Sequence, residues 1–438
     1  MGVVHTQRKP DQASDSDRGF QLPRSWGLTV SVLCLGLLVG FSSGLLARFF
    51  ELIQVGLLGF SETSGAPTAE TVQPIRRLAS VTLAGLVAGL VWAWLRTRTK
   101  LVPSVGQAVK GAPMPPGRTV IHVLTQIFFV AAGGSIGREV APREAGALLG
   151  GLWARMGRRL GLRDQDGPLL VTSAAGAGFA GIYIAPLTGA FFGIEVLLRR
   201  VDAEVVTVNL AMSALATLVG GSIKGFAPYY KVGSEPFRPG LMAVVLLIGP
   251  VMGLLGAGFR RMTSWAEAHR TTGPAVIWQL TGVALLTGLV ALVIPQVLGN
   301  GRALAQMGMD QRLSAGFSGL QLAQSLASLV LFALAKALLT TATIRAGAFG
   351  GTLTPSIALG SATGAVLGLL LACLVPGLPV WQCAVVGAAS LLAASQQAPL
   401  MAMAMLMEVC HLPVMAFMPM GLAVALSMAV SRLFAAKA

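Results

Sequence analysis

The sequence predicts an all-α integral membrane protein whose two halves are inverted-topology repeats of tilted and broken helices. Its 438 residues are 54% hydrophobic and only 11% charged, whereas about a quarter of a soluble protein is charged. Glycine (54 residues) and proline (23 residues) are frequent, and transmembrane helices tolerate both better than soluble helices do. A set of residues that recurs at one fixed spacing indicates that the chain consists of two related halves.

The basic residues are informative because of where they lie. The net charge of +15 would favour nucleic-acid binding in a soluble protein. Here Lys and Arg cluster in short stretches between apolar runs, at positions 96–100, 155–159, 199–200 and 260–261. We interpret them as topology determinants and lipid-headgroup contacts of a multi-pass protein in the cell inner membrane, and we expect no nucleic-acid partner.

Apolar segments follow a polar N-terminal stretch. Long segments such as 168–198 contain Gly and Pro, which favours pairs of short or tilted helices over single rods. We expect a disordered cytoplasmic arm over 1–24, a first membrane repeat over 25–222, a connecting loop over 223–239 and a second repeat over 240–438. The first apolar run is interpreted as a retained helix, not a signal peptide, and no soluble regulatory domain is expected after the last run.

An internal repeat links the two halves. Inverted repeats with Gly- and Pro-broken segments in corresponding places are typical of transporters, whose binding site lies between the repeats. Four residues of the first half recur in the second at one spacing of 213 positions: Gly137 and Gly350, Pro142 and Pro355, Pro186 and Pro399, and Glu195 and Glu408.

The segment 133–144 carries four charges, Arg138, Glu139, Arg143 and Glu144, inside an apolar region. Intramembrane charges are costly and indicate function. The glycines allow a backbone break, after which a helix N-terminus presents N–H groups and positive dipole to an anion. Glu139 lies at this break, so its carboxylate can occupy the place of the anion and leave it on protonation. The alternative is a structural i,i+4 ion pair between Glu139 and Arg143.

Two further segments are candidates for anion binding. Residues 346–355 are the pseudo-symmetric partner of the first motif, and Thr352 and Leu353 can donate N–H groups there; the alternative is close helix packing through small residues. Ser104 follows a basic stretch, and its hydroxyl can bind a halide without trapping it. From the sequence alone, a helix-capping role for Ser104 is favoured.

Other polar residues point to structure more than to chemistry. For Glu195 and Glu408, which end the matched segments, we favour capping or pairing over cation binding. The four His and four Cys have no metal-binding spacing, and nucleotide-binding and hydrolase motifs are missing from the sequence. We therefore expect no metal, no cofactor and no enzymatic activity.

At these residues the chain resembles the CLC family of chloride channels and proton-coupled chloride transporters, over about 26–435. Residues 137–139 match the start of the family's G-R-E-G-P, and 347–355 match G-x-x-G-G-x-F-x-P. The resemblance implies a homodimer in which each subunit holds its own pore. It also implies that Glu139 is the gating glutamate and that the anion is bound at Ser104, Gly137, Arg138, Thr352 and Leu353.

Several positions depart from the family pattern. Val140 and Ala141 replace Gly-Pro after the gate, and Leu353 stands where the family usually has Phe. Val196 stands where the family's transporters carry a second, internal glutamate. The chain also ends before the helix that carries the family's pore tyrosine. These departures weaken the expectation of proton coupling more than that of anion conduction.

The sequence thus predicts transport of a small inorganic anion, chloride first, through a pore gated by protonation of Glu139. The alternative within transport is a proton-coupled antiporter, with fluoride as one candidate anion, that uses a non-standard proton route. A non-conducting scaffold or membrane enzyme is the alternative from another class, and it requires that the four charges near Glu139 pair with one another.

Overall fold

The structure, a computed structural model, describes residues 23–63, 67–98, 101–237, 240–313, 318–375 and 377–435. Within these residues the regular structure is helical apart from one isolated β-bridge. The first half holds α1 (Arg24–Ile53), α2 (Pro74–Arg98), α3 (Val105–Val109), α4 (Pro116–Ala131), α5 (Val140–Met156), α6 (Gly167–Tyr183), α7 (Pro186–Phe191) and α8 (Ala203–Lys224). The second holds α9 (Leu241–Ala268), α10 (Ala275–Val290), α11 (Arg302–Met309), α12 (Gly319–Arg345), α13 (Leu353–Ala372), α14 (Val380–Gln396), α15 (Pro399–Val409) and α16 (Phe417–Ala435).

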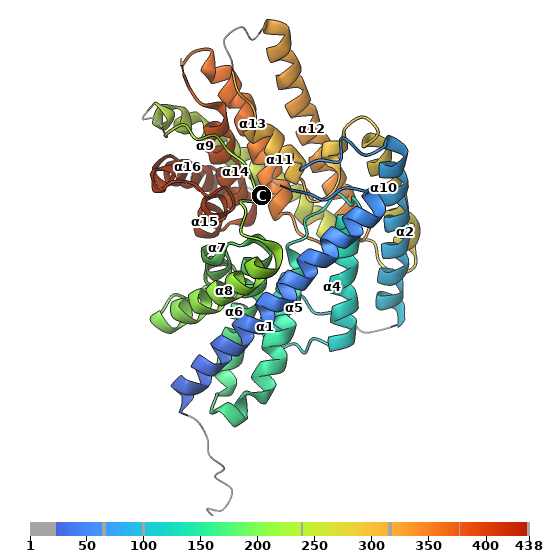
Figure 1. Cartoon of the computed structure of the whole chain (residues 1–438), viewed down its shortest axis with the longest axis vertical. Coiled ribbons are helices and arrows are strands. Elements are labelled where there is room, and N and C mark those ends of the chain that lie inside the picture. The colour runs from blue at the N-terminus through green and yellow to red at the C-terminus, as the bar shows by residue number, and fades with distance from the viewer. Residues whose placement is uncertain are drawn as a thin grey trace, which may run out of the picture.

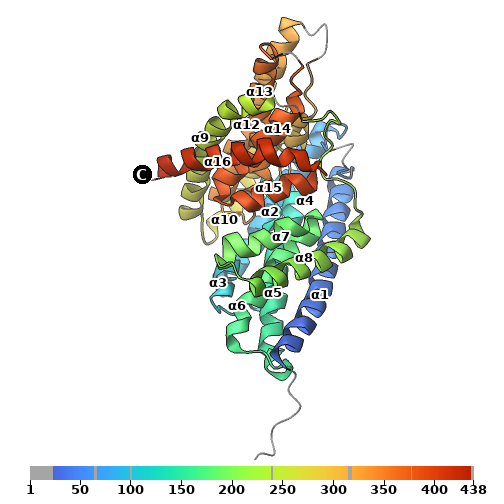
Figure 2. The same cartoon turned by 90° about the vertical axis from the view of Figure 1, so that its left-hand side faces the viewer.

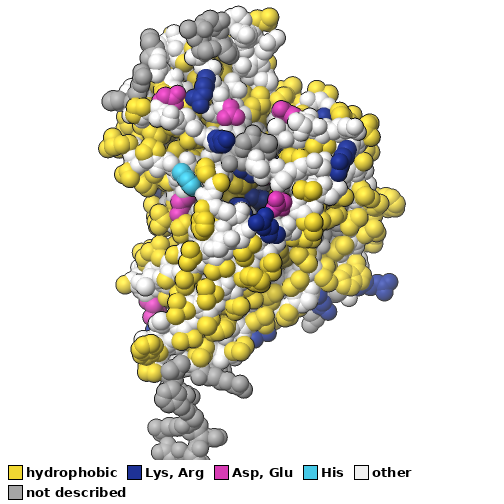
Figure 3. Space-filling model, viewed as in Figure 1, with side chains coloured by type: hydrophobic (Ala, Val, Ile, Leu, Met, Phe, Trp, Pro, Cys, Tyr) yellow, Lys and Arg dark blue, Asp and Glu magenta, His cyan; other side chains and the backbone are white. Residues whose placement is uncertain are grey.

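The lengths and surfaces of these helices suit a membrane. Among the described residues, seven helices are long and apolar enough to cross one. Large apolar side chains such as Leu37, Leu254 and Leu334 are about half exposed, and Figure 3 shows a broad apolar surface over the lower part of the molecule. An apolar exterior of this extent is stable against lipid and not against water, which confirms an all-α integral membrane protein.

The internal repeat is visible in the backbone itself. Ile184 and Gln397, 213 positions apart, end α6 and α14 in the left-handed conformation with φ of 58° and 55°. The alanines that follow have nearly identical backbone angles, φ −136° with ψ 78° and φ −137° with ψ 78°. The predicted break within 168–198 is therefore confirmed as the α6–α7 junction, and it recurs between α14 and α15.

The two halves meet where α7 contacts α15 and where α2 packs against α10. In Figures 1 and 2, helices α1, α5, α6 and α8 lie below α13 to α16. Glu195, in the π-helical turn Phe192–Leu198 that extends α7, accepts hydrogen bonds from Leu400 N–H (3.2 Å) and Met401 N–H (2.9 Å) at the start of α15. Glu408 in α15 does the reverse at the start of α7.

Of the two carboxylates that cap these helices, Glu408 accepts more and shorter hydrogen bonds than Glu195. Glu408 accepts from the N–H groups of Leu187 (2.7 Å) and Thr188 (2.8 Å) and from the Thr188 hydroxyl (2.6 Å). Carboxylates at helix N-termini satisfy donors that have no partner within the helix. The capping interpretation of Glu195 and Glu408 is thus confirmed, and the mutual arrangement shows that α7 and α15 run antiparallel, as inverted repeats require.

The expected segment boundaries need two adjustments. Residues 1–22 of the expected arm lie outside the described residues, and Arg24 already begins α1, anchored by Asp166 (2.6 Å) and Glu204 (2.7 Å). The connection between the halves begins later than expected, because α8 continues through Lys224, and the chain is then non-helical through Phe237.

Candidate functional site

The two Gly-rich segments of the sequence meet in the interior. The N–H of Gly137 donates to the carbonyl of Gly351 (2.7 Å), and the N–H of Gly351 donates to the carbonyl of Gly137 (2.9 Å). A Cβ atom on Gly137 would lie 2.3 Å from Oε2 of Glu139, and one on Gly351 would lie 2.0 Å from Oε1. Both positions therefore have to be glycine for the carboxylate to lie between the two segments.

Glu139 is fully buried and is held by the opposite half of the protein. It precedes the first residue of α5, and its Oε1 accepts a hydrogen bond from the N–H of Leu353 (2.6 Å), the first residue of α13. The Thr354 hydroxyl lies 3.4 Å from Oε2. The first N–H groups of a helix lack internal partners and carry positive partial charge, so this position binds an anion. The carboxylate of Glu139 is that anion here.

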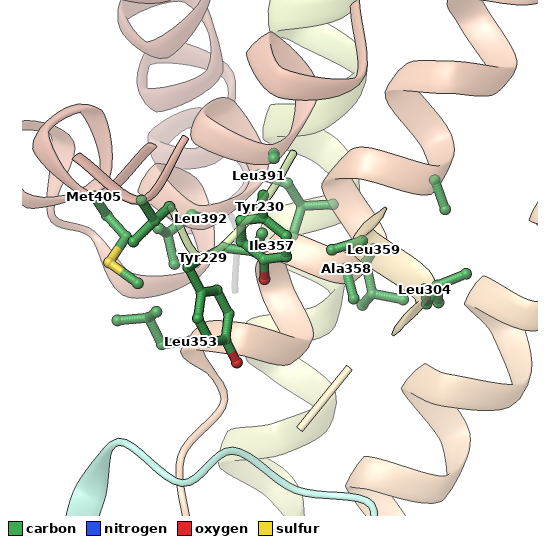
Figure 4. Packing of buried hydrophobic residues seen from close by; sticks show 14 of the residues in the cluster. Tyr229, Tyr230, Leu304, Leu353, Ile357, Ala358, Leu359, Leu391, Leu392 and Met405 are labelled. Carbon is green, nitrogen blue, oxygen red and sulfur yellow. The ribbon is translucent and has the colours of Figure 1, made fainter. Parts of the chain in front are cut away.

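The phenol of Tyr183, which was not among the predicted site residues, completes this contact. The hydroxyl groups of Tyr183 and Thr354 are 2.9 Å apart, and both side chains are buried. Tyr183 ends α6, just before the left-handed Ile184, so the α6–α7 break aims its ring at the start of α13. Figure 4 shows Leu353 within the cluster of buried side chains that also holds Tyr229, Tyr230 and Ile357.

Arg138 points away from the carboxylate of Glu139. Its guanidinium lies over the rings of Phe50 (4.3 Å), Tyr229 (5.5 Å) and Tyr183 (5.7 Å). It lines a cavity of about 230 Å³ together with Arg48, Lys224, Arg302, Glu51 and Glu62. Figure 3 shows Lys and Arg side chains in a hollow near the centre of this face. Cations that remain on a cavity wall raise the local anion concentration.

Arg143 does not form the ion pair that was the structural alternative for Glu139. Its guanidinium is sandwiched between the rings of Phe179 (4.3 Å) and Phe192 (4.1 Å). Its Nε and Nη2 atoms are buried without a hydrogen-bond partner among the described residues. Because the Glu139 carboxylate is bonded to the start of α13, an i,i+4 pair does not explain why the charges are here.

A buried cation supports the first glycine-rich segment from behind. Lys336 in α12 is completely buried, and its Nζ donates to the Ser135 hydroxyl (2.9 Å) and to the carbonyls of Val297 (3.1 Å) and Gly299 (2.6 Å). All three ammonium protons thus have acceptors, which is what a buried Lys needs. In the sequence, the one sign of this support was a single Lys within an apolar run.

The predicted residues Gly137, Arg138, Glu139, Thr352 and Leu353 are brought together, with Thr352 preceding α13 and accepting from Gln396 Nε2 (3.1 Å). Ser104 is exposed and forms a reciprocal capping box with Gln107 at the start of α3. This is the capping role that the sequence alone favours, and the role of Ser104 in anion binding stays a prediction.

Val196 lies in the π-helical turn that extends α7 and packs against the main apolar core. The end of α3 opposite to the one that Ser104 caps lines a cavity of about 600 Å³, whose wall carries Lys110, Arg155 and Arg163 beside the start of α6. Cationic side chains therefore line both described polar cavities.

The chain matches known proteins over most of its length. Residues 84–432 match the family described as voltage gated chloride channel. The chain is 29% identical over 388 residues to the voltage-gated ClC-type chloride channel ClcB of Salmonella dublin, which covers 85% of this chain and 88% of that protein. The ClcB of Escherichia coli SMS-3-5 is 28% identical over 386 residues, with 85% and 88% covered.

Solved structures show the same fold. A slow cyanobacterial Cl⁻/H⁺ antiporter superimposes with a TM-score of 0.76 at 18% identity, covering 92% of this chain and 95% of that one. A CLC-type fluoride/proton antiporter superimposes with a TM-score of 0.62 at 22% identity, with the same coverage. With its inverted repeats, its glutamate between two glycine breaks and a family match over residues 84–432, the chain belongs to the CLC family of anion transport proteins.

Proposed function

We propose that this protein carries a small inorganic anion, chloride first, across the membrane, and that protonation of Glu139 opens the path. The observation that carries the proposal is the 2.6 Å hydrogen bond from Leu353 N–H to the Glu139 carboxylate. A site that holds a carboxylate at a helix N-terminus suits a halide once that carboxylate leaves. Protonation removes the charge that favours the carboxylate there, so it frees the site.

The contacts between helix ends support an orientation. Arg24 joins the start of α1 to the α5–α6 connection and to the start of α8. Arg76 bonds the carbonyls of Gly56 and Leu57, so the start of α2 lies beside the opposite end of α1. The end of α2 then lies with the first group, and Arg96 ties it to Thr271 after α9. The basic stretches collect at this end, which we assign to the cytoplasm.

In this orientation, the cavity with Lys110, Arg155 and Arg163 is cytoplasmic and the one with Arg138 and Lys224 faces the other side. Positive walls at both mouths favour an anion over a cation. By family membership we further propose a homodimer with one path per subunit, in the inner membrane of a bacterial cell. Crosslinking in native membranes that yields a two-subunit product tests the dimer.

The proton-coupled alternative differs in one measurable respect. A passive path moves anions without protons, whereas an antiporter drives anions with a pH gradient. The apolar Val196 offers no proton acceptor at the position of the family's internal glutamate. A pH gradient across vesicles with equal anion on both sides discriminates, because only an antiporter then gives net anion flux.

Anion efflux from reconstituted liposomes tests the proposal. We expect wild-type chloride efflux to rise between about pH 7.5 and pH 4.5, where carboxylates become protonated. Glu139→Gln should conduct at both values, because the neutral amide resembles the protonated acid. Glu267→Gln, at an exposed glutamate near the end of α9, is the matched control. No efflux of chloride, fluoride or nitrate above empty liposomes contradicts the transport function, and a full pH response in Glu139→Gln contradicts the gate.

A further inference from the structure

We infer that Glu144, with His122 and Gln126, forms a proton-binding site on the cytoplasmic side of the Glu139 gate and couples the anion path to protons. The inference rests on the proposed transport function. It assigns a role to a buried charge that neither gating nor anion binding uses. Glu144 is 5% exposed and lies five residues along α5 from Glu139, which is about 7.5 Å along a helix axis.

The immediate partners of Glu144 are neutral. Its Oε2 accepts a hydrogen bond from Gln126 Nε2 (2.7 Å) and lies 3.5 Å from His122 Nε2, both on α4. His122 Nδ1 accepts from the indole N–H of Trp92 (3.1 Å). Because indole only donates, Nδ1 carries no proton, and the neutral imidazole holds its proton on Nε2, facing Glu144. Trp92 therefore keeps His122 uncharged and leaves Glu144 as the group that can change its charge.

Both protonation states of Glu144 have hydrogen-bond partners. The ionised carboxylate accepts a hydrogen bond from Gln126 and lies 3.5 Å from Nε2 of His122. The protonated acid can donate to Oε1 of Gln126, which is buried and has no hydrogen-bond partner among the described residues. A buried oxygen without a partner costs free energy, and Oε1 of Gln126 lacks a partner only while Glu144 is ionised. This pair is therefore suited to a carboxyl that gains and loses a proton.

The charged groups around this site lie toward the cytoplasmic end. The guanidinium groups of Arg96 and Arg270 lie over the Phe349 ring at 4.7 and 4.4 Å, and the His122 ring lies 4.6 Å from it. Both arginines are partly exposed. On α5 itself, the neighbouring Arg143 is directed into its aromatic sandwich.

The same Phe349 leads back to the gate. It directly precedes Gly350 and Gly351, and Gly351 contacts the Glu139 carboxylate. The chain of contacts thus runs from the partly exposed arginines through Phe349 and His122 to Glu144 on one side, and to Glu139 on the other. In one cycle Glu144 binds a single proton from the cytoplasm and gives it up to water in the path, and the carboxylate of Glu139 takes up one proton from that water. Glu144 is left ionised and Glu139 neutral.

Two measurements on the full-length chain test this site. The first is an infrared difference spectrum between acidic and neutral buffer in a Glu139→Gln background, which needs no transport. We expect a protonated carboxyl band that disappears when Glu144→Gln is added and persists when Glu267→Gln is added. If no band responds to Glu144→Gln, the proton-binding site is refuted.

The second measurement is anion uptake driven by a pH gradient in liposomes. We expect wild type and Glu267→Gln to show gradient-driven uptake, and Glu144→Gln to fall to the level of empty liposomes while it still passes anions down their own gradient. That residual flux shows that the variant is folded. Gradient-driven uptake in Glu144→Gln, or none in wild type, refutes the coupling. Absence of any anion flux in wild type instead refutes the transport function, and the infrared result still decides the proton site.

Discussion

The substitution Gly351→Ala should displace the gating carboxylate of Glu139 without changing its charge. The new methyl group would lie 2.0 Å from Oε1 of Glu139, whereas real Cβ contacts essentially never fall below 3.0 Å, so the two must separate by at least 1 Å. The backbone cannot easily yield, because Gly351 is bonded in both directions to Gly137. The carboxylate must move, although its charge is unchanged, and it loses its 2.6 Å bond to Leu353 N–H.

The size of the effect follows from that bond. A hydrogen bond to a charged group contributes about 1.5–3 kcal/mol, which corresponds to a shift of about 10- to 150-fold in the ratio of closed to open gate. Chloride efflux at neutral pH should therefore rise in Gly351→Ala, and its ratio between acidic and neutral pH should shrink. Efflux from liposomes over a pH series measures both quantities.

Controls for this substitution come from its neighbours. A Cβ at Gly350 would also be crowded, at 2.8 Å from the Gly137 carbonyl and 2.9 Å from Ile136, but its nearest contacts do not include Glu139. Gly350→Ala should keep the wild-type pH ratio. If the new methyl itself blocks the path, Gly351→Ala will also reduce efflux in a Glu139→Gln background. An unchanged pH ratio in Gly351→Ala would refute the reasoning, because the carboxylate would then not gate from this place.

Two predictions concern stability. Glu408→Gln should lower the melting temperature in detergent more than Glu195→Gln, because Glu408 accepts three bonds of 2.6–2.8 Å and Glu195 two of 2.9–3.2 Å. Each charge-assisted bond contributes about 1.5–3 kcal/mol, and equal losses in the two variants would contradict this. Burial favours the neutral form of Asp166, but the hydrogen bonds from Arg24 outweigh it and hold the pKa of Asp166 below its ordinary 3.8. The stabilisation from ionised Asp166 is thus complete above pH 3.8 and is lost as pH falls through the lowered pKa. Melting temperatures measured between about pH 3 and 7 should therefore fall less in Asp166→Asn than in wild type. Parallel melting curves for the two proteins would contradict this prediction.

Much of the architecture could be predicted from local information. The apolar runs set the membrane class, because an exposed apolar surface needs lipid. The recurrence of Pro186 and Glu195 as Pro399 and Glu408 predicted the repeat, because Pro fixes where a helix can start, and the structure reproduces even the backbone angles at Ile184. The place of Glu139 beside Leu353 was predictable in outline, because both follow glycine-rich breaks that precede a helix.

The partners of the charges could not be predicted in the same way. Arg143 was as compatible with an ion pair to Glu139 as with the aromatic sandwich that it occupies. The contacts of Glu144 with α4 and of Tyr183 with α13 join residues 18 and 171 positions apart. The sequence by itself determined the class, the repeat and the positions of the helix breaks, since these depend on local composition and on backbone conformations open to Gly and Pro. Only the tertiary structure decided which buried charge meets which partner, since that depends on how the two halves pack against each other.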